Sequence, residues 1–395
     1  MRSPRRLAPG AVIRALLSAI SFVVLAPVAF AVLGGYFPAW PVVGPFGRLL
    51  NAGLPLVVGA AGVGTGLAAL AIALGGRKVV VLLVAAMTLL TGAGVIAYRY
   101  VSFAEQHGAA YDLVRAVDGS PSAAQPDDRI TFATIDGESL DADLWFPQSP
   151  PPEGGVPAVV FVHGGAFISG TPGTRNALLA ALRDQGIAGV DIEYRLAPPP
   201  RWDQAPGDVL CALAWLHSVE GPEGVDPTRV VVIGESAGGN LALMAAYAAG
   251  TDAIKSSCPE AGPPIPPAGV VAIAPTADLA AIWHDATIYD APGRLFPEAY
   301  IGGPPSQFPG RYEAASPMRL LRANLPPTLL LSGEIDRFVL IERTIALADR
   351  IRATGSSVEL LVAPFASHGF DGEPNSFGAQ LSEAVIPAFV RRVAG

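Results

Sequence analysis

Cysteine, lysine and N-terminal acidic residues are scarce in this chain, and each scarcity excludes a class of function. The only cysteines are Cys211 and Cys258, too few for a disulfide framework, and no Cys/His spacing suggests a zinc site. Lysine occurs only at positions 78 and 255 and the net charge is -8, so no basic tract is available for a phosphate backbone. We therefore expect no metal centre and no nucleic-acid partner. Whether the two cysteines pair with each other stays open.

Apolar residues, in contrast, are abundant, and they concentrate near the N-terminus. They make up 51% of the chain, and the mean hydropathy is +0.43, more than a soluble domain needs. Three apolar runs, at 15–34, 53–76 and 79–98, each approach the ~20 residues that a membrane-spanning helix requires. No acidic residue precedes Glu105. Buried helices of a soluble domain are the alternative, but runs without a polar face leave nothing to contact water. We predict that residues 1–99 form a transmembrane helical region.

The positive charges around these runs predict their orientation. One arginine, Arg48, lies between the first and second runs, whereas basic residues precede the first run and separate the second from the third: Arg2, Arg5, Arg6, Arg14, Arg77 and Lys78. The positive-inside rule then puts the N-terminus in the cytoplasm and the residues after 99 outside it, in a multi-pass protein of the cell membrane. The first run also has features of a signal peptide. Its cleavage is open, but it would leave the C-terminal part on the same side.

The chain changes character after residue 99. Residues 100–128 form a connector, in which Phe103 to Val117 fits a short amphipathic helix. From residue 129 to 395, short apolar runs alternate with helical patterns, which predicts a mostly parallel sheet covered by helices on both faces. The two earliest runs lack an intervening helix, so we expect an antiparallel start. The predicted strands are 130–135, 143–146, 158–162, 187–194, 230–233, 270–274, 328–331 and 358–362.

A candidate nucleophile follows the fifth predicted strand. The sequence Gly-Glu-Ser-Ala-Gly at 234–238 stands between that strand and an amphipathic helix, which is the setting of a nucleophile elbow. The two glycines are needed because the turn is tight and the backbone passes close to its neighbours. The pattern therefore predicts Ser236 as the nucleophile.

A second glycine-rich segment follows the third predicted strand. It reads Phe-Val-His-Gly-Gly-Ala-Phe at 161–167. In acyl transfer the carbonyl oxygen becomes an oxyanion, and backbone N–H groups that point at it lower the barrier. We predict an oxyanion hole from Gly164, Gly165, Ala166 and the N–H of Ala237. His163 is interpreted as a brace for this loop.

The remaining two roles fall to Asp336 and His368, each in a loop after a predicted strand. Their order after Ser236 is that of hydrolases in which the imidazole links the hydroxyl to a carboxylate. We predict His368 as the general base and Asp336 as the acid that orients it. Glu334 competes for the acid role but lies closer to the strand end. The other histidines, His107, His217 and His284, have no preceding strand and are interpreted as structural or surface residues.

Four motifs in chain order resemble the bacterial hormone-sensitive-lipase-like esterases of the α/β-hydrolases: His-Gly-Gly at 163–165, Tyr-Arg-Leu-Ala-Pro at 194–198, Gly-Glu-Ser-Ala-Gly-Gly-Asn at 234–240 and His-Gly-Phe at 368–370. The resemblance covers residues 129–395. It implies an α/β-hydrolase fold and carboxylesterase activity on acyl esters, without metal or organic cofactor. We expect a membrane-anchored esterase that acts through an acyl-enzyme on short- to medium-chain acyl esters or lipid-derived substrates. Two features depart from the family pattern. Ala166 replaces a glycine, and the sequence after Asp336 lacks the family's Asp-Pro-Leu-x-Asp-Glu.

Residues 276–322 interrupt the alternation of strands and helices. They hold Trp283, Tyr289, Phe296, Tyr300 and Phe308, so this insertion is either a lid or acyl-pocket wall, or a packing excursion without substrate contact. Two other functions are weighed against an esterase. A ligand-binding receptor on the same fold usually lacks one of the three site residues, whereas this chain keeps all three. The other is a transporter or structural membrane protein, and spans without an intramembrane acid make a poor transport path. Acyl length, alcohol and oligomeric state stay open.

Overall fold

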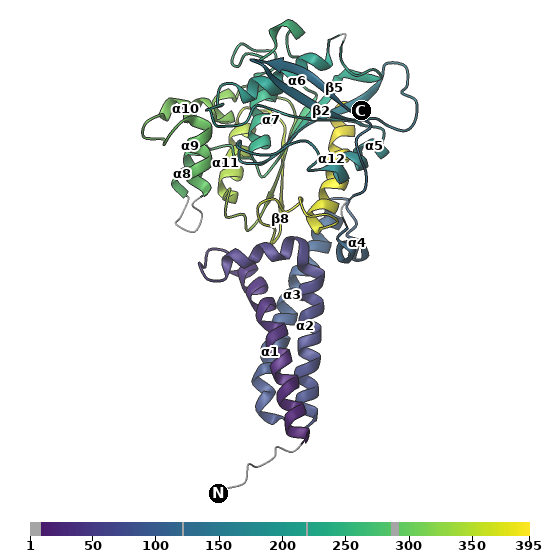
Figure 1. The fold of residues 1–395 in the computed structure, drawn as a ribbon, viewed down its shortest axis with the longest axis vertical. Coiled ribbons are helices and arrows are strands. Elements are labelled where there is room, and N and C mark those ends of the chain that lie inside the picture. The colour runs from purple at the N-terminus through teal and green to yellow at the C-terminus, as the bar shows by residue number, and fades with distance from the viewer. Residues whose placement is uncertain (1–8, 121, 219, 286–291) are drawn as a thin grey trace.

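The molecule has two parts, a long helical bundle and a domain with a large sheet at one end of it (Figure 1). The structure is a computed structural model that describes residues 9–120, 122–218, 220–285 and 292–395. Three arginines used to predict orientation, Arg2, Arg5 and Arg6, lie outside the described residues, as does Tyr289. The N-terminal end of the bundle is the end remote from the sheet domain.

The bundle contains the three helices α1 (Pro9–Tyr36), α2 (Leu49–Ala73) and α3 (Val80–Gln106). Each is long and apolar enough to cross a membrane, with mean hydropathies of 2.6, 2.1 and 2.4 in their most apolar windows. The α1–α2 connection ends in the 3-10 helix η1 (Gly44–Arg48) next to the sheet domain, and η2 (Arg77–Val79) joins α2 to α3 at the far end. At that far end the Arg14 guanidinium donates a hydrogen bond to the Leu74 carbonyl.

The connector differs from its prediction. Helix α3 continues past residue 99 to Gln106, so Phe103 belongs to the third long helix rather than to a separate one. A short helix, α4 (Leu113–Asp118), follows after a break, and the Asp112 carboxylate caps it by accepting from the N–H groups of Val114 and Arg115. The prediction of one helix from Phe103 to Val117 is therefore wrong, because Asp112 starts a new helix.

The second part is built on one sheet of eight strands, in the order β1-β2-β4-β3-β5-β6-β7-β8. Strand β2 is antiparallel to both β1 and β4, and the other neighbours are parallel. All eight predicted strands and their antiparallel start are confirmed. The strands are β1 (Asp128–Ile135), β2 (Glu138–Trp145), β3 (Val156–Val162), β4 (Ala188–Ile192), β5 (Val225–Glu235), β6 (Gly269–Ile273), β7 (Thr328–Gly333) and β8 (Val358–Ala363).

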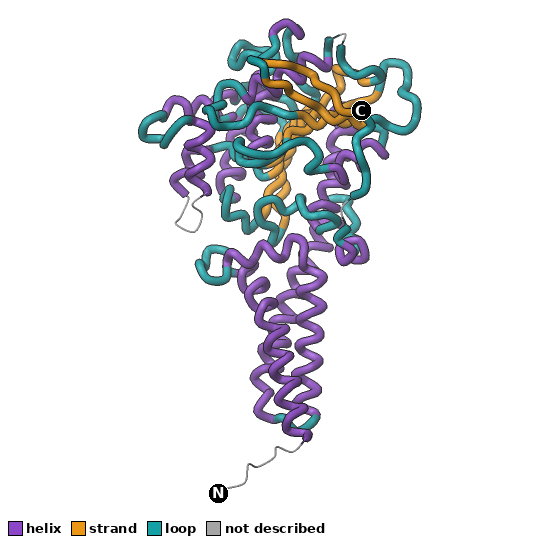
Figure 2. The backbone as a smooth tube through the Cα atoms, in the orientation of Figure 1, coloured by secondary structure: helices purple, strands orange, loops and turns teal. Residues whose placement is uncertain are grey.

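Helices cover both faces of this sheet (Figure 2). Side chains of a strand alternate between its faces, and β3 shows the result. Val160 and Val162 belong to the same core as α6 (Ala205–Leu216), α7 (Ala237–Ala248) and α11 (Ile341–Ala353). Val159 and Phe161 belong to the core that includes α5 (Asn176–Asp184) and α12 (Phe377–Ala394). Burial on both faces explains why β3 is a continuous apolar run.

The insertion between β6 and β7 forms a helical lobe beside the sheet (Figure 1). Its elements are α8 (Leu279–Asp285), α9 (Pro292–Ile301), α10 (Pro309–Ala314) and η4 (Pro317–Leu320).

The bundle and the sheet domain share a hydrophobic core. Tyr100 of α3 stacks on Phe377 of α12 with ring centroids 4.0 Å apart, and Tyr36 of α1 meets Phe365 edge to face at 5.1 Å. Leu50 and Leu54 of α2 belong to the same buried cluster. The bundle therefore supports the loop that follows β8 by direct packing.

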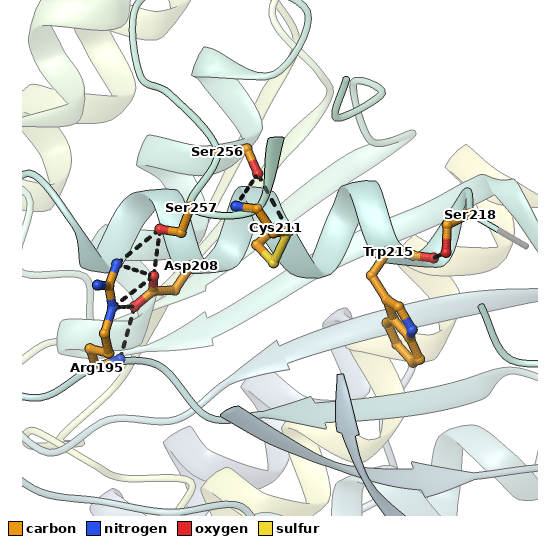
Figure 3. Close-up of a disulfide and its surroundings, with 8 residues drawn as sticks. Arg195, Asp208, Cys211, Trp215, Ser218, Ser256 and Ser257 are labelled. Carbon is orange, nitrogen blue, oxygen red and sulfur yellow. Dashed lines mark hydrogen bonds and ion pairs between the residues drawn. A yellow bond between two sulfur atoms is a disulfide. The ribbon is translucent and has the colours of Figure 1, made fainter. Parts of the chain in front are cut away.

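The two cysteines form a disulfide, with Cα atoms 5.2 Å apart (Figure 3). Cys211 lies in α6, and Cys258 precedes η3 (Pro259–Ala261). The adjacent Ser257 hydroxyl donates to Asp208 at 2.6 Å, and the Arg195 guanidinium pairs with the same carboxylate at 2.7 Å. Arg195, from the Tyr-Arg-Leu-Ala-Pro motif, thus helps to hold the cysteine-bearing segment against α6. The pairing left open by the sequence is present in the structure.

Candidate active site

Ser236 occupies the tight turn between β5 and α7. Its backbone has φ 52° and ψ -114°, a strained conformation for a residue with a side chain and one that is common at functional sites. A Cβ atom at Gly234 would lie 2.1 Å from the Gly238 oxygen, and one at Gly238 would lie 2.0 Å from the Val162 oxygen. Only glycine fits these two positions, as the elbow pattern predicts.

Ser236, His368 and Asp336 form a continuous hydrogen-bonded chain. The distance from His368 Nε2 to Ser236 Oγ is 2.9 Å, and that from His368 Nδ1 to an Asp336 carboxylate oxygen is 2.8 Å. The Asp336 side chain is fully buried, whereas that of His368 is 25% exposed. Since a carboxylate accepts, the proton of the neutral ring belongs on Nδ1, and Nε2 accepts from the serine hydroxyl.

The two acidic candidates after β7 have different partners. The second carboxylate oxygen of Asp336 accepts from the N–H groups of Phe338 and Val339, at 2.8 and 2.9 Å. Glu334 instead accepts from the Phe365 N–H at 2.9 Å and pairs with Arg99 of α3 at 3.3 Å. Only Asp336 of this pair contacts His368, so the geometry favours it for the acid role.

A buried ionic cluster beside Ser236 is absent from the sequence predictions. The Arg175 guanidinium lies 2.6 Å from Glu235 and 3.0 Å from Asp371, with side-chain exposures of 5%, 16% and 1%. Burial raises the pKa of Asp371, although the charge of Arg175 opposes the effect. Glu235 and Asp371 are sequence neighbours of site residues, but nothing in the sequence indicates that Arg175, far upstream, joins them.

This cluster bears on the basicity of His368. Burial alone lowers the pKa of the imidazole, but the charge and hydrogen bond of Asp336, helped by Glu235 and Asp371, outweigh it and leave the pKa above its ordinary value. A base with a raised pKa accepts a proton from serine more readily.

The glycine-rich loop after β3 has an unusual backbone. Gly165, Ala166 and Phe167 all have positive φ, and a Cβ atom at Gly165 would lie 1.9 Å from the Ser169 oxygen. Within the described chain, no acceptor receives the N–H groups of the four predicted donors, Gly164, Gly165, Ala166 and Ala237. The protein therefore leaves the donor capacity of these four groups unused in the described chain.

His163 contacts this loop and its neighbour rather than Ser236. Its Nδ1 lies 2.7 Å from the Gly164 carbonyl oxygen, and its ring stacks on Tyr194 with centroids 4.5 Å apart. Burial lowers the pKa of His163, which favours the neutral ring. These contacts fit the bracing role proposed for it. The rings of His107 and His217 each bond to a backbone carbonyl oxygen one turn earlier in the chain. His284 instead packs edge to face against Trp283.

The insertion packs over the site. Phe296 of α9 stacks on Phe338 with centroids 5.1 Å apart, and Phe338 lies 4.8 Å from the His368 ring. Phe296 also meets Phe167 of the glycine-rich loop at 6.3 Å. Trp283, in contrast, contacts Glu298 within the lobe. The insertion is thus a wall of the site region on its α9 side, and contact with substrate stays a prediction.

Residues of the bundle hold the loop that carries His368. Asn51 of α2 donates from its side-chain amide to the Ser367 hydroxyl at 2.8 Å and accepts from the Ser367 N–H at 3.1 Å. Tyr100 of α3 donates its hydroxyl to the Phe365 carbonyl at 3.3 Å. The sequence gives no signal for these contacts, because they join residues more than 260 positions apart.

No group of three or more His, Cys, Asp or Glu side chains that could hold a metal ion occurs among the described residues. The groups assembled at Ser236 suit nucleophilic attack on a carbonyl: a hydroxyl, a base in contact with it, an acid that orients the base, and backbone donors without acceptors.

Comparisons with known proteins also point to a hydrolase. Residues 159–372 match a family model described as the alpha/beta hydrolase fold, and this stretch includes every candidate site residue. The chain is 32% identical to Esterase LipC of Mycobacterium tuberculosis over 237 residues, which are 58% of this chain and 56% of that protein. It is 28% identical to ethyl acetate hydrolase of Pseudomonas putida over 249 residues, 61% of this chain and 74% of that one. The match thus spans little more than half the length of the first relative.

Solved structures show the same fold. The apo form of Thermogutta terrifontis esterase 2 superposes with a TM-score of 0.56 at 21% identity, covering 69% of this chain and 96% of that one. The propionate-bound form of the same esterase gives a TM-score of 0.53, covering 67% and 94%.

Proposed function

Since the chain belongs to the α/β-hydrolase family, we propose that it is a membrane-anchored serine carboxylesterase acting through an acyl-enzyme. The observation that carries this proposal is the chain of hydrogen bonds from Ser236 through His368 to Asp336. Relatives named as esterases and as an ethyl acetate hydrolase support the reaction class.

The proposed reaction has two halves. The Ser236 hydroxyl attacks the ester carbonyl carbon as His368 Nε2 takes its proton, and the tetrahedral oxyanion forms. His368 then gives the proton to the alcohol oxygen, the ester C–O bond breaks, and the acyl group stays on serine. Water, deprotonated by His368, attacks the acyl-enzyme, and the acid leaves while the proton returns to serine.

The four unpaired N–H groups of Gly164, Gly165, Ala166 and Ala237 support an oxyanion hole in this reaction. Loss of one such donor costs about 3 kcal/mol of barrier lowering in comparable enzymes. The substitution of alanine for the family's glycine at 166 keeps the N–H, and Ala166 has the positive φ that glycine adopts readily.

The proposed cellular location is the cell membrane, with the α/β domain outside the cytoplasm. Arg14 and Arg77 lie toward the bundle end remote from that domain, which is the expected cytoplasmic end under the positive-inside rule. The disulfide between Cys211 and Cys258 supports the same side, because disulfides persist in oxidising compartments.

The activity is tested by assaying the detergent-purified full chain on p-nitrophenyl esters of increasing acyl length. We expect turnover, greatest on short to medium chains, and a loss of several orders of magnitude in Ser236→Ala. Ser139→Ala, at an exposed position in β2, is the matched control and should keep the activity. A folded wild-type protein without turnover would favour the receptor alternative, and an active Ser236→Ala would remove the nucleophile assignment.

The orientation is tested with reporters fused after Gly395. A reporter that is active only outside the cytoplasm should be active there, and a cytoplasm-only reporter should be silent. The opposite pattern would overturn the location.

A further inference from the structure

The pocket beside His368 has one wall from the membrane bundle. Its volume is 410 Å³, within the usual range of about 300–1,000 Å³ for ligand sites. The loops after β7 and β8 supply Ile335, Arg337, Phe338, Ser367 and His368, and the α1–α2 connection supplies Gly44, Pro45 and Arg48. A ligand here would touch the base and the bundle at once.

The α1–α2 connection also has the character of a segment at a membrane surface. Phe37, Trp40 and Phe46 are 53%, 52% and 41% exposed, and they lie where two apolar helices end beneath the α/β domain (Figure 1). Aromatic residues concentrate at the interface between acyl chains and water. With the bundle in a bilayer, the mouth of the pocket therefore lies at the level of the lipid head groups.

The pocket lining combines positive charge with apolar surface. Arg48 and Arg337 are its two charged residues, and the described lining contains no carboxylate. Phe338 and Ile335 supply apolar surface next to His368. Guanidinium groups bind phosphate and carboxylate oxygens, so the lining fits a negatively charged head group with an acyl chain attached.

We propose that the substrate is an acyl ester of an anionic lipid resident in the outer leaflet, which enters the pocket along the α1–α2 connection. Arg48 contacts its head group. Its ester carbonyl carbon reaches past His368 to Ser236 Oγ, with the carbonyl oxygen directed at the predicted oxyanion hole. The acyl chains of the lipid need not leave the bilayer completely, because one wall of the pocket is formed by the connection between two helices of the bundle. This inference rests on the ester hydrolysis proposed above and specifies its substrate.

The test uses the full chain reconstituted in vesicles of ether-linked phosphatidylcholine, which contains no hydrolysable ester. A minor component is either didecanoyl phosphatidylglycerol or didecanoylglycerol, whose acyl chains are of medium length, and the fatty acid released is measured. We expect faster release from phosphatidylglycerol. Arg48→Gln should lower the ratio of the phosphatidylglycerol rate to the didecanoylglycerol rate about tenfold, the effect of one charge-assisted contact worth 1.4 kcal/mol. Arg48→Lys should restore part of the ratio.

Arg319→Gln is the matched control, since Arg319 is an exposed arginine outside this pocket. It should leave the ratio unchanged, and a fall like that of Arg48→Gln would reduce the effect to general surface charge and overturn the inference. Equal release from both lipids, or an unchanged ratio in Arg48→Gln, would also overturn it. Hydrolysis of p-nitrophenyl butyrate in the same vesicles without release from either lipid would reject the lipid substrate alone. Failure on all three esters would reject the proposed function as well.

Discussion

Exchange of Asp336 for asparagine is expected to remove nearly all turnover, because the structure dictates how the new amide must point. One carboxylate oxygen of Asp336 accepts from the N–H groups of Phe338 and Val339, while the other faces His368 Nδ1. The amide oxygen of asparagine would take the first position, since an NH₂ group there would oppose two donors. Its NH₂ group would then face His368 Nδ1.

An amide that donates to Nδ1 places the ring proton on Nε2. This is the nitrogen 2.9 Å from Ser236 Oγ, so the imidazole could no longer accept the serine proton. The same tautomer error in a serine protease lowers kcat about 10⁴-fold, which corresponds to about 5.4 kcal/mol of barrier. Glu334→Gln should be far milder. It keeps the acceptor for the Phe365 N–H and weakens a pair with Arg99 that is 39% and 46% exposed, worth about 1 kcal/mol or less and thus a factor of about five at most.

The assay is kcat on p-nitrophenyl butyrate for the wild type and both variants, with circular dichroism to verify that each is folded. A larger loss in Glu334→Gln than in Asp336→Asn would exchange the two roles. Small losses in both variants would refute the argument that a carboxylate sets the tautomer.

Three further outcomes are expected. Asn51→Leu removes both contacts with Ser367 and should lower kcat more than it changes KM. Asn51→Asp keeps the acceptor for the Ser367 N–H and should recover much of the lost kcat. Equal activity of the wild type and both variants would deny Asn51 a positioning role. The profile of kcat/KM should fall as pH drops through the raised pKa of His368, above the ordinary value of about 6.5, because only the neutral ring accepts a proton. In Glu235→Gln this limb should move to lower pH, and a shift upward would contradict the electrostatic reasoning. Replacing both cysteines by alanine removes a disulfide between residues 47 positions apart. It should reduce the free energy of unfolding by about 2–4 kcal/mol in denaturant titrations. An unchanged free energy of unfolding would mean that the disulfide is not formed.

The parts of the fold that depend on local pattern could be predicted from the sequence. Strands buried on both faces must be continuous apolar runs, and β3 and β6 are such runs. The turn at Ser236 needs glycine on both sides because backbone atoms lie within 2.1 Å of where a Cβ would be. Candidate residues placed after successive strand ends could be expected to meet at one edge of the sheet, and Ser236, His368 and Asp336 do meet.

The parts that depend on distant packing could not be predicted. The cluster of Arg175, Glu235 and Asp371 needs the fold to bring a loop before α5 under the elbow. The sequence does not predict the break between α3 and α4, because Phe103 to Val117 keeps a helical pattern and only the Asp112 cap decides where the second helix begins. Hydropathy likewise predicts three long apolar helices near the N-terminus. It does not predict which end of the bundle they form contacts the loop that carries His368.

The contacts at that end give the N-terminal bundle a role beyond that of the membrane anchor proposed for it. A simple anchor needs only length and apolarity, and its junction with the soluble domain is ordinarily a flexible linker. Here three helices contribute buried side chains to the core of the α/β domain. Asn51 and Tyr100 bond to the loop that carries His368, and Arg99 pairs with Glu334 close to Asp336. A catalytic geometry tolerates displacements of only about 0.5 Å, so a shift of α2 or α3 would alter the base and its acid before it altered the elbow of Ser236, which is held by the sheet. The bundle is therefore expected to act as a structural part of the proposed active site, since it holds the loops of His368 and Asp336 as well as carrying the three apolar helices.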